Sequence, residues 1–186
     1  MPAKVYLEAA TLLDLNAICV TNHGNMGDYD WLKTAAPAGL TVIPGVEISS
    51  SEGDFLIYSG DLEFLRLLEA DQPLPPRNER PAGTAVVWAH PFAGRPGALG
   101  VSQEYIAGVA LSVDGIEVYN GNWPDDKASV EAARIATKYS LAELGGSDTH
   151  RREQLMRCWT EINAEIQTVA DLVEAIKNRN TTAHKL

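Results

Sequence analysis

The sequence predicts an α/β fold in which short buried strands alternate with amphipathic helices. Two observations lead to this prediction. Short uncharged runs such as residues 17–21 and 85–89 have the composition of buried strands, whereas residues 124–139 have helical spacing of their apolar positions. Strands and helices that alternate in this way form βα units around a mainly parallel sheet, either open or closed into a barrel.

The first half of the chain contains three predicted helices and three predicted strands. Apolar residues recur with helical spacing from residue 3, and Asp28 stands where it could cap the second helix. We expect helices at 3–15, 28–36 and 60–70, and strands at 17–21, 40–49 and 54–58.

The second half continues the alternation after a proline-rich segment at 71–84, which we interpret as a surface loop within a single domain spanning 1–186. Pro124 suits the first turn of one helix. Residues 179–186 are expected to be a frayed tail. The remaining predicted strands are 85–89, 115–119, 141–145 and 158–162, and the remaining helices are 102–110, 124–139 and 168–178.

Composition limits the classes of partner and location. The 25 acidic and 15 basic residues give a net charge of −10, which would repel nucleic acid and anionic membranes. No apolar stretch approaches the ~20 residues of a membrane span. Residues 1–20 carry charges unlike a signal peptide, so we expect a cytoplasmic protein. Cys19 and Cys158 lie in apolar runs and are expected to be buried, reduced thiols.

Metal-ligand side chains gather at the carboxyl ends of the predicted strands, where α/β folds place their functional groups. A histidine or an aspartate alone at such a position is more often a satisfied polar residue or a helix cap. Five together favour a site for Zn²⁺, Mn²⁺ or Fe, because imidazole and carboxylate are the ligands of these ions. The five residues are His23, Glu47, His90, Asp148 and His150, whereas His184 lies in the tail and is expected to be inert.

Five motifs in order along the chain carry a resemblance to the polymerase and histidinol phosphatase (PHP) family. They are Val20-Thr21-Asn22-His23, Ile43-Pro44-Gly45-Val46-Glu47-Ile48-Ser49, Ala89-His90-Pro91, Gly115-Ile116-Glu117-Val118-Tyr119-Asn120 and Gly146-Ser147-Asp148-Thr149-His150. The resemblance implies a distorted (βα)7-type barrel that holds one to three metal ions and hydrolyses phosphate esters. It also implies that the five residues named above are the metal ligands.

The sequence departs from the family pattern in its ligand set. The family opens with a strand bearing a His-x-His pair, whereas this sequence starts in the first predicted helix. Asn22 and Gly24 flank His23 where the family has other residues, and residues 54–58 lack the expected histidine. The ligand sharing of the family then implies three sites with two ligands each: Glu47 with Asp148, His23 with His150, and Glu47 with His90. Either Met1 is an internal methionine of a longer protein, which we favour, or the protein is naturally shortened.

Two functions follow from these observations. The first is a metal-dependent phosphoesterase that uses metal-activated water on a small phosphorylated metabolite or nucleotide, with Arg95, Arg151 and Arg152 as phosphate contacts. The alternative is a non-catalytic PHP-like module that binds a ligand or a partner protein. A proofreading domain of a DNA polymerase is disfavoured by the negative charge.

An incomplete barrel leaves one strand edge open. The run at residues 17–20 is apolar and uncharged, with none of the features that protect natural sheet edges. We therefore expect a homodimer in which a second copy covers this edge. The alternative is that the strand at 158–162 closes the barrel internally.

Overall fold

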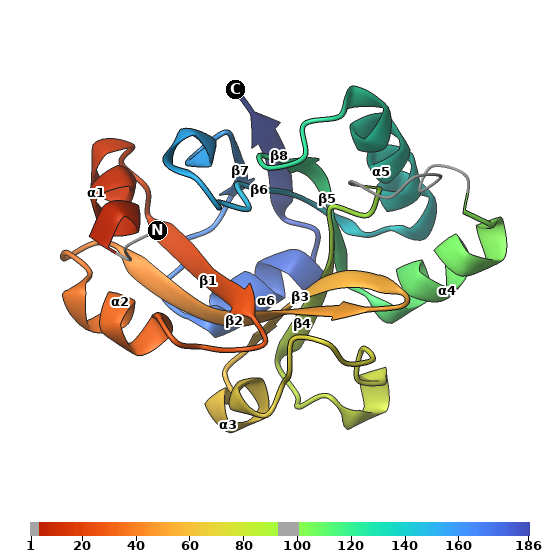
Figure 1. Cartoon of the computed structure of the whole chain (residues 1–186), viewed down its shortest axis with the longest axis horizontal. Coiled ribbons are helices and arrows are strands. Elements are labelled where there is room, and N and C mark those ends of the chain that lie inside the picture. Colours follow the sequence, from red (N-terminus) through yellow and green to blue (C-terminus); the bar gives the residue numbers. More distant parts are fainter. Residues whose placement is uncertain (1–3, 93–100) are drawn as a thin grey trace.

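The computed structural model describes residues 4–92 and 101–186. Six strands form one curled sheet in chain order, a half-barrel that is open on one side (Figure 1). β1 pairs with β2, β4 with β5 and β5 with β6 in parallel, while β3 is antiparallel to both of its neighbours. The strands are β1 (Ala17–His23), β2 (Thr41–Ser50), β3 (Gly53–Ser59), β4 (Thr84–Ala89), β5 (Gly115–Asn120) and β6 (Ala142–Gly146).

The predicted α/β class is confirmed, and β3 is the main departure from the expected βα repeat. Only two residues separate β2 from β3, which is enough for a hairpin but far too short for a parallel crossover. As a result, the amino end of β3 lies at the same rim of the sheet as the carboxyl ends of β2 and β4.

Each predicted helix is present, and most are shorter than predicted. Asp28 precedes α2 without capping it through its side chain, and accepts a hydrogen bond from the Asn22 amide instead (3.2 Å). Asp125 caps α5, with Pro124 lying just outside the helix. The helices are α1 (Lys4–Leu12), α2 (Tyr29–Ala35), α3 (Leu62–Arg66), α4 (Gln103–Ser112), α5 (Asp126–Tyr139) and α6 (Val169–Lys177), with 3-10 turns η1 (Arg77–Glu79) and η3 (Arg152–Gln154).

Strands β2 to β5 are mostly buried on both faces, which explains why they are nearly continuous apolar runs. One face packs against α6, where Ile43, Tyr58 and Val87 meet Leu172 and Ile176. The alternate residues of the same strands, including Val46, Phe55 and Trp88, belong to a second cluster that also contains residues of the other helices. Apolar packing of this kind contributes about 25 cal/mol per Å² of buried surface.

The C-terminal segment is a strand, so the prediction of a frayed tail is wrong. β8 (Thr181–Lys185) pairs antiparallel with β7 (Cys158–Ile162), and the pair lies beside β6 (Figure 1). The main-chain amide of Leu186 also donates to the Arg157 carbonyl (2.9 Å). His184 lies on β8, where it stacks on Trp159 and contacts Glu161, away from the predicted ligands.

β1 remains an edge strand among the described residues, because its only strand partner there is β2. Among the described residues β7 pairs with β8 in a separate sheet and not with β1, so the alternative in which residues 158–162 close the barrel is wrong. Between β1 and the β6–β7 side lies a hollow of about 1380 Å³, lined by both, by β2 and by the loop at 146–150.

Both cysteines are free thiols, as expected. Cys158 is buried, whereas Cys19 is exposed in the hollow, so the expected burial of Cys19 is wrong.

None of the helices in the described part of the chain is long and apolar enough to cross a membrane.

The homodimer that covers β1 stays a prediction, and light scattering tests it. In reducing buffer at tens of micromolar, the protein should have twice the mass of the chain, because pairing satisfies the open backbone groups of β1. Cys19→Lys places a charge on an exposed side chain of this strand and should shift the mass to that of the monomer. A wild-type protein that is strictly monomeric at these concentrations would contradict the prediction.

Candidate functional site

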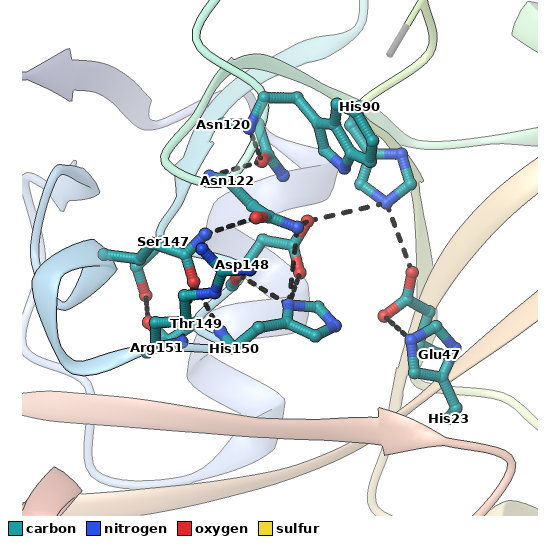
Figure 2. Close-up of polar contacts among 12 residues, drawn as sticks. His23, Glu47, His90, Asn120, Asn122, Ser147, Asp148, Thr149, His150 and Arg151 are labelled. Carbon is teal, nitrogen blue, oxygen red and sulfur yellow. Dashed lines mark hydrogen bonds and ion pairs between the residues drawn. The ribbon is translucent and has the colours of Figure 1, made fainter. Parts of the chain in front are cut away.

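All five predicted ligands lie together at one rim of the sheet, each within 4 Å of the next (Figure 2). Glu47 contacts two imidazoles, with Oε2 3.6 Å from His23 Nε2 and Oε1 3.3 Å from His90 Nε2. Asp148 also lies between two imidazoles, with Oδ2 3.9 Å from His90 Nε2 and Oδ1 3.2 Å from His150 Nδ1. The side chains therefore form a continuous row of alternating imidazole and carboxylate groups.

The register of the sheet and two tight turns create this row. His23 and Glu47 are direct partners in the parallel pairing of β1 with β2. His90 and Asp148 follow β4 and β6 in left-handed backbone conformations, with φ of +26° and +43°. Such φ values are uncommon for residues other than glycine and are often found at functional sites.

Glu117 is a residue of the candidate site that the sequence analysis did not single out. Its side chain is buried on β5, and Oε2 accepts hydrogen bonds from the His90 main-chain N–H and from Asn120 Nδ2 (2.9 Å each). Burial raises the pKa of Glu117, and the nearby charge of His90 and these hydrogen bonds partly oppose that rise. The carboxylate thus helps to hold His90 in its left-handed turn. The sequence did contain a signal for it, because Glu117, like Glu47, is an acidic residue within an apolar strand.

Asp54 is the second residue that was missed. It lies at the amino end of β3, with Oδ2 3.6 Å from His90 Nδ1. The two ring nitrogens of His90 therefore face different carboxylates, an arrangement that orients histidines in metal sites. Burial by itself would lower the pKa of His90, but the hydrogen bond to Glu47 and the charges of Glu117, Glu47 and Asp148 raise it to about 9.

The hollow that the row faces is acidic. Among the described residues, its lining contains no lysine or arginine, and its acidic members are Asp14, Asp28, Glu47, Glu117, Asp148, Glu161 and Glu165. A surface of this kind attracts cations and repels a phosphate group unless a cation is bound there. Arg151 and Arg152 are exposed beside the hollow, and Arg95 lies outside the described residues, so their proposed phosphate contacts stay predictions.

The donor types and pair spacings fit a divalent cation. Two ligands of one ion, each at about 2.0–2.2 Å in tetrahedral geometry, lie about 3.4 Å apart, close to the 3.3 Å between Glu47 Oε1 and His90 Nε2. Within residues 4–92 and 101–186, however, no three such side chains converge closely enough to form a group that could hold an ion as they stand. Pairs of protein ligands would leave the other coordination positions to water or substrate.

The raised pKa of His90 predicts how the stability of the metal-free protein depends on pH. A histidine whose pKa is about 9 when folded and 6.5 when unfolded stabilises the folded state fully below pH 6.5. This contribution is lost as the pH rises through 9. The free energy of unfolding, measured in urea from pH 6 to 9.5 with a chelator, should therefore decrease, and His90→Gln should flatten the dependence. An unchanged slope in the variant would contradict the assignment.

The contact between Glu117 and Gly146 predicts the effect of a single methyl group. A Cβ atom at Gly146 would overlap Glu117 Oε1 and displace the carboxylate from the His90 amide. Gly146→Ala should therefore reduce the free energy of unfolding by about 1–3 kcal/mol.

Gly108→Ala is the matched control, because a Cβ atom at this position in α4 would meet no described atom within 4 Å apart from its chain neighbours and the backbone of its own helix. It should be neutral or stabilise the protein by roughly 0.5–1 kcal/mol. Equal effects of the two substitutions in urea unfolding would show that Glu117 does not constrain this strand end.

Comparisons with known proteins agree with this architecture. Residues 129–181 match the family model described as PHP-associated. PsfC from Pseudomonas syringae aligns with a TM-score of 0.74 at 22% identity, covering 98% of this chain and 82% of that one. A candidate metal-dependent phosphoesterase from Bifidobacterium adolescentis aligns with a TM-score of 0.63 at 15% identity, covering 96% and 91%. No curated protein matches by sequence. The PHP-associated match at residues 129–181 agrees with the resemblance to the PHP family, and the two solved structures share the fold of this chain.

Proposed function

We propose that this protein is a metal-dependent phosphoesterase. The observation that carries the proposal is the row of three imidazoles and two carboxylates in pairwise contact, facing an acidic hollow whose described lining lacks lysine and arginine. Such a site favours cations over a free phosphate group. The similarity to a candidate metal-dependent phosphoesterase supports the same reaction class.

The row of side chains contains the residues that would hold the ions. Glu47 could bridge two positions, since its oxygens face His23 and His90 separately. Asp148 has the same relation to His90 and His150. Zinc, manganese or iron ions held there would supply positive charge for the phosphoryl group and lower the pKa of water.

The chain's own residues prepare this site in three ways. His90 must release its proton before it can act as a ligand, so Glu47, Glu117 and Asp148 make ion binding compete with protonation. Asp54 and the Glu117 contact to the His90 main chain orient the ring and its turn. His23 and His150 have side chains that are 54% and 55% exposed, so a small phosphorylated metabolite or nucleotide could reach them from solvent.

Metal content and hydrolysis test the proposal together. Protein reconstituted with Mn²⁺ or Zn²⁺ should retain metal after gel filtration and cleave p-nitrophenyl phosphate. Glu47→Gln should lower kcat/KM by about 100-fold or more, because the row loses the carboxylate that faces two imidazoles.

His184→Gln is the control, since it removes an imidazole on β8 that does not take part in the row, and should leave the rate unchanged. Substoichiometric metal without any cleavage would instead favour a non-catalytic module that binds a ligand or partner.

A further inference from the structure

Two side-chain amides, Asn122 and Gln154, hydrogen-bond to each other, and Asn122 lies beside Asp148 and His150 (Figure 2). The proposed reaction does not use either of them. Gln154 ends the 3-10 turn η3, and Asn122 follows β5, so the two come from different strand connections. Their hydrogen bonds nevertheless determine which end of each amide is the N–H donor, and the last donor in the series faces Asp148.

The orientation of Gln154 is set by the main chain. Its Oε1 accepts hydrogen bonds from the main-chain N–H groups of His150 (2.8 Å) and Arg151 (2.7 Å). Main-chain N–H groups can only donate, so the atom facing them must be the oxygen. The Nε2 group of Gln154 therefore points away from them and donates to Asn122 Oδ1.

The orientation of Asn122 follows from that of Gln154. Since Asn122 Oδ1 accepts from Gln154, its Nδ2 group faces the site, 3.4 Å from Asp148 Oδ2 and 3.4 Å from His150 Nδ1. The main-chain N–H of Asn122 donates to Asn120 Oδ1 (3.0 Å), and Asn120 itself donates to Glu117. Hydrogen bonds thus fix both the side-chain amide of Asn122 and its main chain.

We infer that Gln154 and Asn122 are positioning residues that together present an N–H donor to Asp148 and hold its carboxylate between His90 and His150. This donor restrains a side chain on a left-handed residue, whose φ is +43°. It also leaves Asp148 Oδ1 facing His150 Nδ1 (3.2 Å), while His150 Nε2 has no hydrogen-bond partner among the described residues and could accept a ligand. The consequence for metal binding rests on the proposed function, whereas the direction of donation does not.

A cap on η3 is the competing role for Gln154, and Gln154→Glu separates the two. A glutamate keeps an oxygen for the main-chain N–H groups of His150 and Arg151, so a role limited to capping would be preserved. Its second oxygen cannot donate to Asn122 Oδ1. The Asn122 amide must then turn over and direct its oxygen at the Asp148 carboxylate. Charge alone would act in the opposite way, because an added carboxylate attracts cations.

Isothermal titration with Mn²⁺ and NMR of the metal-free protein test this relay. In Gln154→Glu the affinity for Mn²⁺ should fall at least about tenfold, as when an outer-shell partner of a ligand is lost. The unfolding midpoint of the metal-free variant should stay within about 2 °C of wild type, since the cap is kept. Gln103→Glu makes the same chemical change at the start of α4, outside the hollow, and should leave the affinity unchanged.

The side-chain amide signals of Asn122 report on the relay without any metal. In wild type these protons should exchange slowly, and in Gln154→Glu they should shift and exchange faster. Unchanged Asn122 signals in the variant, or an affinity equal to or higher than that of wild type, would overturn the inference. If the wild type binds no Mn²⁺, the proposed function fails, and the Asn122 signals alone decide whether the relay exists.

Discussion

The buried carboxylate of Glu117 is the constraint on which the arrangement of the site depends. It accepts hydrogen bonds from the main chain of His90 after β4 and from Asn120 at the end of β5, and it lies against Gly146 at the end of β6. One side chain thereby connects three strand ends. Burying a charge is costly unless it is paired and hydrogen-bonded, so these partners must stay in place for the carboxylate to remain there.

Negative charge determines which chemistry the hollow can support. Within its described lining, the acidic residues have no lysine or arginine to balance them, and the raised pKa of His90 is one result of this excess. In the metal-free protein, a proton on His90 neutralises part of the charge. Bound cations would take over this role, and they would turn a surface that repels phosphate into one that attracts it. Protonation of His90 and ion binding would therefore each add positive charge that offsets the acidic residues of the hollow.

The loops of the site combine unfavourable backbone conformations with many hydrogen bonds. His90 and Asp148 both have positive φ, and each is held by a side chain from β5 or from the residues that follow it. Glu117 restrains the first, and Asn122, oriented by Gln154, restrains the second. The local conformational cost, on the order of 1–3 kcal/mol per residue, is offset by contacts that only the folded sheet can provide.

The sequence by itself determined the fold class and the identity of the five clustered residues, because both follow from local patterns. Apolar runs mark buried strands, and the carboxyl ends of parallel strands share one rim, so His23, Glu47 and His90 could be grouped before their distances were known. Only the tertiary structure decided the rest. The β2–β3 hairpin places Asp54 beside His90. Residues 181–185 form a strand because they pair with β7, and Gln154 hydrogen-bonds to Asn122 from a different loop. These contacts join segments that are far apart in the chain, and their pairing depends on how the sheet curls, which no local pattern of residues encodes.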